Sequence, residues 1–196
     1  MTTDVKTNEV IISSESSFDR QTLYDKALEL GRIFSHESAV AKMGIYGSLA
    51  RGIKSPADID LLIFVRDPAL VKRIMMIRTD ETRDKPIIKD PEGYLEEALF
   101  SRLSEPGRFT LIRTLLEKVP DNGKIRQYPV DYFLLPYPVT NQYIAIESKA
   151  NKDPKFLASI ASDVLIYSPN KDAFVKETVF TPQQTGYINT LAQSRS

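Results

Sequence analysis

Apolar residues recur along this chain with two kinds of spacing, one typical of helices and the other of strands. The helical spacing covers roughly residues 18–35, where apolar side chains return every three or four positions at Leu23, Ala27, Leu30 and Phe34. The strand pattern consists of short runs of β-forming apolar residues bounded by Gly, Ser or Pro, at 40–46, 59–65, 130–135 and 164–167. We therefore expect helices combined with a sheet of several short strands.

Other segments also carry helix signals. Proline at a first helical position, directly after a capping aspartate, favours a helix start. On this basis and on apolar spacing, helices are predicted at 69–77, as a pair across about 91–119, and after Asp153-Pro154. The charged segment 78–89 is interpreted as an exposed connection with a solvated basic surface, and a phosphate-facing patch is the alternative.

A chain of 196 residues suits one domain with loose ends. Residues 1–15 and 181–196 are polar and predict a flexible arm and a flexible tail. The domain itself is expected to span 16–180, with a helical insertion at about 90–120.

Composition narrows the class of protein. The chain is 42% hydrophobic and 27% charged, which is ordinary for a globular domain with a sizeable core. Its formal net charge of zero argues against extended nucleic-acid binding. It contains no cysteine, so neither disulfides nor thiolate metal sites are expected. No apolar run approaches membrane-spanning length, and the first residues lack a signal-peptide pattern. A cytoplasmic protein is therefore the expectation.

The candidate chemistry lies around the first two predicted strands. The first strand breaks on Gly47-Ser48, and the second begins with Asp58 and Asp60. Residues two apart in a strand point to the same face, so these two carboxylates are expected to lie side by side. Such a pair repels itself unless a cation intervenes. Mg²⁺ binds carboxylate oxygens together with substrate phosphates.

These residues also carry a resemblance. The phrase GSLARGIKSPADIDLLIFV, from Gly47 to Val65, resembles the signature of the nucleotidyltransferase superfamily related to DNA polymerase beta, and most of all its minimal nucleotidyltransferases. The resemblance implies an α+β (α/β-like) nucleotidyltransferase fold, a small mixed twisted sheet flanked by helices. It also implies Mg²⁺-dependent transfer of a nucleoside monophosphate, most simply AMP from ATP, to a hydroxyl.

The resemblance assigns roles to individual residues. Asp58 and Asp60 would bind metal and catalyse, and Asp131, at the start of the third predicted strand, would be the third carboxylate. Should Asp131 be misplaced, Asp67 or Glu147 would be the next candidates.

The loop residues Gly47, Ser48 and Arg51 would bind the nucleotide. A glycine lets backbone amides approach phosphate closely, and Ser48 and Arg51 are donors. The alternatives are an ordinary turn for Gly47-Ser48 and, for Arg51, a surface pairing with Asp58 or Asp60.

The acceptor stays open at this point. Minimal nucleotidyltransferases often act as antitoxins that adenylylate a partner helical toxin of the HEPN type, whereas aminoglycoside nucleotidyltransferases modify a small molecule. The sequence shows no long helical pattern after Tyr167, which favours a protein acceptor or another small substrate. From a different class, the alternative is a non-catalytic protein of the same fold that neutralises a partner by contact.

Overall fold

The computed structural model describes residues 18–83, 87–103, 119–121, 124–126, 130–150 and 155–193. The predicted arm at 1–15 and most of the second helix of the predicted insertion lie outside these residues. Within them, no helix is long and apolar enough to cross a membrane.

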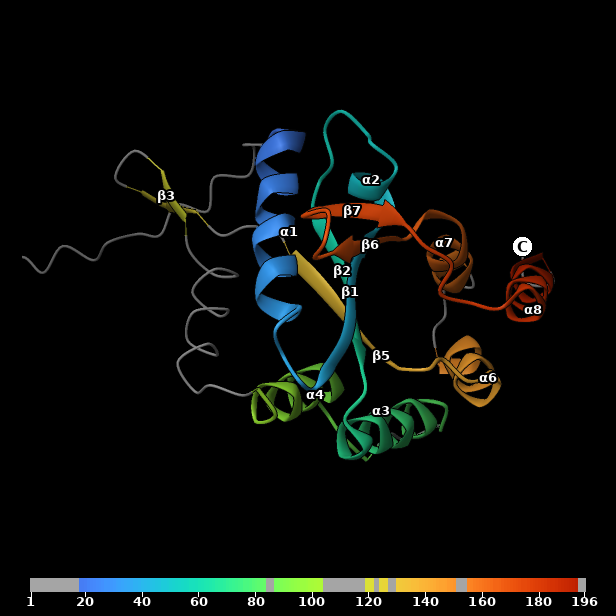
Figure 1. The fold of residues 1–196 in the computed structure, drawn as a ribbon. Helices are drawn as coiled ribbons and strands as arrows, with labels where there is room; N and C mark the ends of the chain where they lie inside the picture. The colour runs from blue at the N-terminus through green and yellow to red at the C-terminus, as the bar shows by residue number, and fades with distance from the viewer. Residues whose placement is uncertain are drawn as a thin grey trace, which may run out of the picture.

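A five-stranded mixed sheet forms the centre of the described structure (Figure 1). Its strand order is β5-β2-β1-β6-β7, and neighbours are antiparallel except β2 and β5, which run parallel. The strands are β1 (Val40–Tyr46), β2 (Ile59–Val65), β5 (Val130–Pro136), β6 (Leu165–Ser168) and β7 (Ala173–Lys176). A separate antiparallel pair consists of β3 (Val119–Asp121) and β4 (Lys124–Arg126). The predicted α+β class, a small mixed sheet flanked by helices, is confirmed.

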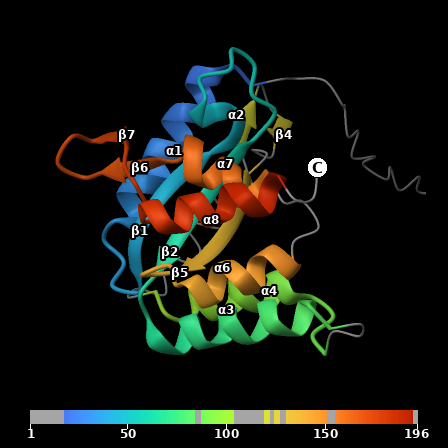
Figure 2. The same ribbon diagram turned by 90° about the vertical axis from the view of Figure 1, so that its right-hand side faces the viewer.

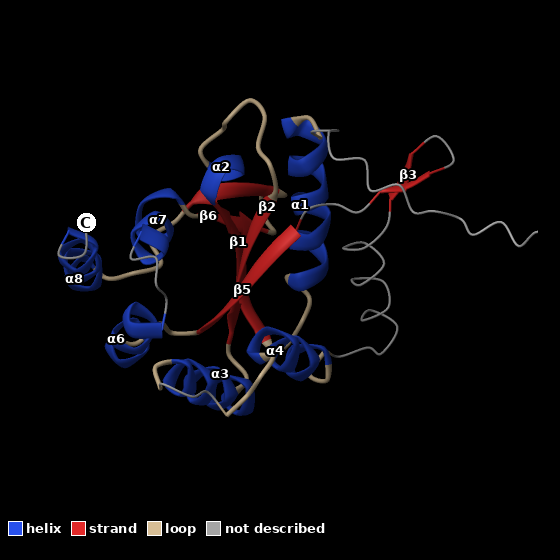
Figure 3. Cartoon of the chain, turned by 180° about the vertical axis from the view of Figure 1, so that it is seen from behind, coloured by secondary structure: helices blue, strands red, loops and turns tan. Residues whose placement is uncertain are grey.

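Helices enclose this sheet from both sides. They are α1 (Arg20–Phe34), α2 (Gly47–Ala50), α3 (Pro68–Glu81), α4 (Pro91–Phe100), α6 (Asn141–Ala150), α7 (Lys155–Asp163) and α8 (Pro182–Gln193). Seen from behind, the central strands lie between α1 on one side and α6 and α7 on the other (Figure 3). Figure 2 looks onto the second side, with α6, α7 and α8 in front of the strands.

Alternation along β2 sends its side chains to these two sides. Leu61 and Ile63 meet Phe34 of α1 and Leu99 of α4. Asp60 and Leu62 therefore point to the opposite face, toward α7. Because the buried side chains of β2 fix its register, the face on which Asp60 projects is fixed as well.

Two predictions about segment boundaries are wrong. The predicted flexible tail, 181–196, contains helix α8, whose Ile188 is buried and which packs on α7 and α6. The predicted exposed connection, 78–89, begins inside α3, which runs on to Glu81 and buries Arg78 and Asp80. Both segments are rich in polar residues, which does not predict a helix from the sequence. Tertiary contacts stabilise the helix there in spite of that composition.

Helix α6 and strand β7 were not predicted at all. The buried face of α6 includes Tyr143, Ile144 and Glu147, so two of its core positions look polar in the sequence. Glu147 forms an ion pair with Arg78 of α3, with Nε and Oε2 3.2 Å apart. The insertion expected at about 90–120 begins as predicted with α4, capped by Asp90, whose side chain accepts a hydrogen bond from the Gly93 amide at 3.1 Å.

Candidate active site

Three neighbouring strands place a row of polar side chains at one end of the sheet. Tyr46 of β1 lies opposite Asp60 of β2, and Asp60 lies opposite Asp131 of β5. Side chains directly opposite one another on adjacent strands share a face. Asp58, two residues before Asp60, projects to that face as well.

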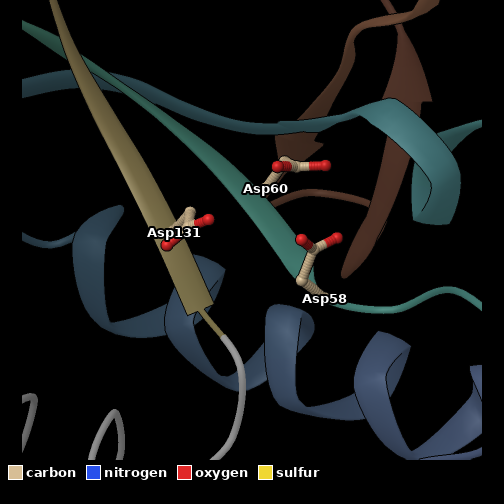
Figure 4. Close-up of side chains that lie close together, drawn as sticks. All are labelled: Asp58, Asp60 and Asp131. Carbon is tan, nitrogen blue, oxygen red and sulfur yellow. The ribbon is translucent and has the colours of Figure 1, made fainter. Parts of the chain in front are cut away.

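The structure brings the three predicted carboxylates together. One oxygen from each of Asp58, Asp60 and Asp131 lies within 4.8 Å of the other two. Figure 4 shows all three side chains converging at the ends of β2 and β5. Asp58 and Asp60 are partly buried, whereas Asp131 is exposed on the edge strand of the sheet.

The electrostatics of this cluster are unfavourable for ionised carboxylates. Burial, together with the charges of Asp58 and Asp131, raises the pKa of Asp60 to about 6. Burial and the charge of Asp131 also raise the pKa of Asp58. The pKa of the Tyr46 hydroxyl is raised by burial and by the same three carboxylates, so Tyr46 stays protonated at neutral pH.

A divalent cation suits this donor set. Three converging carboxylates supply hard oxygen ligands and an excess of negative charge, the combination that Mg²⁺ prefers when it also binds substrate phosphates. Burial raises the pKa of Asp60 most, and a cation at this position would offset both that burial and the repulsion from Asp58 and Asp131.

The loop after β1 approaches the same carboxylates. Gly47 has a φ of 71°, a left-handed conformation that L side chains adopt with strain. A Cβ built on Gly47 would also overlap Oδ2 of Asp60. The chain therefore needs glycine here for its backbone conformation and for close approach of the loop to the acidic cluster.

Ser48, the next residue, lies in α2, and its side chain has an unusual environment. Its Oγ is buried and has no hydrogen-bond partner among the described residues. A buried hydroxyl without a partner costs free energy, so such groups in native proteins call for an explanation. A ligand oxygen in the adjacent cleft would provide the missing partner.

Arg51 pairs with a residue that the sequence did not single out. Its Nη1 donates to Oδ2 of Asp163, at the end of α7, at 3.0 Å. The alternative of a pairing with Asp58 or Asp60 is thus wrong for the described structure, although the positive charge of Arg51 still lowers the pKa of Asp60.

An open cleft of about 660 Å³ lies beside the loop and the carboxylates of Asp58 and Asp60. Three parts of the chain line it: the loop with Gly47, Ser48 and Arg51, the segment from Ser55 to Asp60, and a face of α7. The α7 face contributes Phe156 and Ser159. Phe156 falls in the helix predicted after Asp153-Pro154, and no motif in the sequence marks it as a site residue.

The two reserve candidates lie elsewhere. Asp67 caps α3, where its Oδ1 accepts hydrogen bonds from the amides of Ala69 at 3.0 Å and Leu70 at 2.9 Å. It follows the opposite end of β2 from Asp60. Glu147 is 1% exposed in its ion pair with Arg78. Neither belongs to the acidic cluster.

Comparison with known families agrees with this geometry. Residues 28–179 match the family described as "Nucleotidyltransferase domain", a span that contains the loop, all three carboxylates and the cleft face of α7. No curated protein and no solved structure gave a match.

Proposed function

Because the chain belongs to the nucleotidyltransferase domain family, it is a nucleotidyl-transferring enzyme, and we propose that it moves AMP from ATP to a hydroxyl group of another protein. The observation that supports this most is the convergence of Asp58, Asp60 and Asp131 within 4.8 Å beside the Gly47-Ser48 loop. Members of this family generally use a divalent metal and a nucleoside triphosphate. For this chain we propose Mg²⁺ and ATP.

Asp58, Asp60 and Asp131 would hold Mg²⁺, and the loop would hold the phosphates. The chemistry that bound Mg²⁺ supplies is neutralisation of charge at the phosphoryl oxygens and a lower pKa of the acceptor hydroxyl. The backbone amides after Gly47 and the Ser48 hydroxyl would donate to the β- and γ-phosphates. Arg51, half-exposed at the rim of the cleft, would add a charged donor to the same phosphates.

Asp131 would serve the acceptor. The acceptor oxygen attacks the α-phosphorus, the bond from that phosphorus to the bridging oxygen breaks, and pyrophosphate leaves. The acceptor proton passes to the Asp131 carboxylate and then to solvent. Asp131 suits this role because it stands exposed on the edge strand, where an incoming group has access.

An open edge also supports a large acceptor. The carboxylate row ends at β5, the last strand of the five-stranded sheet, so a protein surface presenting a tyrosine hydroxyl can approach Asp131 from outside. On the resemblance to minimal nucleotidyltransferases, we propose a helical toxin of the HEPN type as that partner. A small-molecule hydroxyl is the second candidate.

Labelled ATP tests this proposal. The protein is incubated with Mg²⁺, a cell extract and ATP labelled at either the α- or the γ-phosphate. We expect the α-label in a protein band and no γ-label. The matched control is Asp58→Asn with Asp60→Asn, which should transfer nothing. Label from the γ-phosphate alone, label only in small molecules, or no label from ATP would each contradict the proposal.

A further inference from the structure

The cleft that contains the Gly47-Ser48 loop also has an aromatic wall. Phe156, near the start of α7, is partly exposed and lines the cleft together with Tyr46. The two rings meet edge to face, with centroids 5.7 Å apart and an interplanar angle of 79°. Phe133 of β5 supports Phe156 from a second side, with centroids 4.4 Å apart. The ring of Phe156 is thus held in place by two others while it borders open space.

We infer that Phe156 stacks against the base of the donor nucleotide, with Ser159 beside it as a hydrogen-bonding group for the sugar or the base edge. This inference rests on the proposed function, because it assumes that the cleft takes a nucleoside triphosphate. Aromatic side chains bind bases by their π faces, and a rigid, supported ring loses little entropy on doing so.

The position of the wall follows from the chemistry of transfer. The α-phosphorus must lie at the carboxylates, and the nucleoside is joined directly to that phosphate. The base therefore cannot be far from Asp60. Tyr46 is the neighbour of Asp60 across the sheet, and Phe156 packs on Tyr46. Tyr46 and Phe156 are the aromatic side chains among the described residues that line this cleft.

The same geometry indicates that Phe156 stacks on the base of the donor nucleotide and not on an aromatic acceptor. Phe156 shares one cleft with Gly47, Ser48 and Arg51, the loop proposed to hold the triphosphate. Asp131, the proposed acceptor-side carboxylate, lies exposed on edge strand β5 and is not among the described residues that line this cleft. The acceptor oxygen must approach the α-phosphorus opposite the pyrophosphate leaving group, and therefore away from the loop proposed to hold those phosphates. Because Phe156 shares its cleft with that loop, we assign the wall to the donor.

A stacking contact predicts a preference among nucleotides. Purines offer a larger π face than pyrimidines, so wild-type protein should bind ATP and GTP more tightly than CTP and UTP. Replacing Phe156 by leucine keeps an apolar side chain but removes the ring. Alanine substitutions at base-stacking positions usually cost about 1–3 kcal/mol, roughly 5- to 150-fold in affinity. We expect Phe156→Leu to weaken ATP binding at least about fivefold and to reduce the purine preference.

Calorimetric titrations in Mg²⁺ with ATP, CTP and inorganic tripolyphosphate test the inference. Phe156→Leu should lose affinity for ATP and keep that for tripolyphosphate, which has no base. Phe156→Tyr, which retains the ring, should bind ATP like wild type. Phe100→Leu, on the other face of the sheet, controls for loss of a packed aromatic ring.

The outcomes separate this inference from the proposed function. Equal ATP affinity in wild type and Phe156→Leu would overturn the stacking role and leave nucleotidyl transfer standing. If Phe156→Leu binds ATP like wild type but transfers the nucleotide to the acceptor more slowly, the wall contacts the acceptor instead. Parallel loss of ATP and tripolyphosphate would mean that Phe156 only maintains the site. A wild-type protein that binds neither ligand would overturn both proposals.

Discussion

The carboxylate of Asp60 occupies the space where a side chain on Gly47 would begin. A Cβ on Gly47 would overlap Asp60 Oδ2, and the φ of 71° at Gly47 would strain any other residue. The Gly47-Ser48 loop and the acidic cluster therefore lie directly against each other, so a change in one displaces the other.

Gly47→Ala is expected to lose most Mg²⁺-dependent nucleotide binding, and Gly47→Val to lose it more completely. The new side chain must push Asp60 away from Asp58 and Asp131 or move the loop. Calorimetric titration with a non-hydrolysable ATP analogue measures the loss.

Gly52→Ala is a matched control for this substitution. Gly52 has a similar φ, 73°, but the nearest atom to its added Cβ is Nη2 of Arg20, 3.8 Å away. Both variants bear the left-handed strain of about 1–2 kcal/mol, whereas only Gly47→Ala disturbs Asp60. Equal binding by the two variants would show that the contact with Asp60 is unimportant.

Ser48→Ala should have opposite effects on the free protein and on the complex. Without ligand, the substitution removes a buried hydroxyl that has no partner among the described residues, so the unfolding free energy should stay the same or rise. With the nucleotide analogue, it should cost about 0.5–1.5 kcal/mol of binding free energy, less than Gly47→Val costs. Thermal unfolding with and without ligand measures both. Equal loss of stability in both states would indicate a purely structural hydroxyl.

The sequence predicted the convergence of the three carboxylates better than it predicted the peripheral helices. Gly47, Ser48, Asp58 and Asp60 fall in one contiguous phrase, so strand alternation alone places both carboxylates on one face. For Asp131 the resemblance gave only the role of third carboxylate, and the parallel β2–β5 pairing that sets it opposite Asp60 is seen in the structure alone.

Non-local packing explains what the sequence did not reveal. Phe156 reaches the cleft only because α7 lies over Tyr46 and Phe133, which are distant in the chain. Most residues of helix α8 are polar. Its Ile188 is buried because the helix packs against α6 and α7. The local sequence pattern does not predict either of these contacts.

Asp60→Asn is expected to abolish transfer and to stabilise the metal-free protein. At neutral pH the ionised Asp60 is disfavoured by burial and by two nearby carboxylates, and the amide removes that charge. Thermal unfolding in EDTA should show a higher midpoint for Asp60→Asn than for wild type. Added Mg²⁺ should raise the midpoint of wild type and not that of the variant. A variant with wild-type turnover would contradict the assignment of Asp60 as a metal ligand.

Asp172 should make stability depend on pH in acid. Arg32 donates from Nε and Nη2 to the two oxygens of Asp172 at 2.8 and 2.7 Å, and the Tyr167 hydroxyl donates at 2.8 Å. These contacts, first that of Arg32, lower the pKa of Asp172 to about 2 from 3.8. Its contribution to stability is therefore complete above pH 3.8 and is lost as the pH falls toward 2.

Asp172→Asn tests this because asparagine tolerates the φ of 45° at this position. In urea unfolding, the gap in unfolding free energy between wild type and Asp172→Asn should be constant near neutrality and close between about pH 4 and 2. Arg32→Gln should show the same closing gap. A gap independent of pH over this range would mean that the ion pair contributes nothing.

The pairing of Arg51 with Asp163 should compete with nucleotide binding. The two side chains are 47% and 24% exposed, and exposed pairs of this kind contribute about 0–1 kcal/mol. A hydrogen bond from arginine to a charged phosphate contributes more, about 1.5–3 kcal/mol, so a triphosphate in the cleft should draw Arg51 from Asp163. Asp163→Asn is then expected to strengthen ATP binding by up to about fivefold, and Arg51→Gln to weaken it. In the Arg51→Gln background, Asp163→Asn should have no further effect, as a double-mutant cycle measured by calorimetry would show. If Asp163→Asn instead weakens binding as Arg51→Gln does, the pair positions α7 against the loop and does not compete with the phosphates.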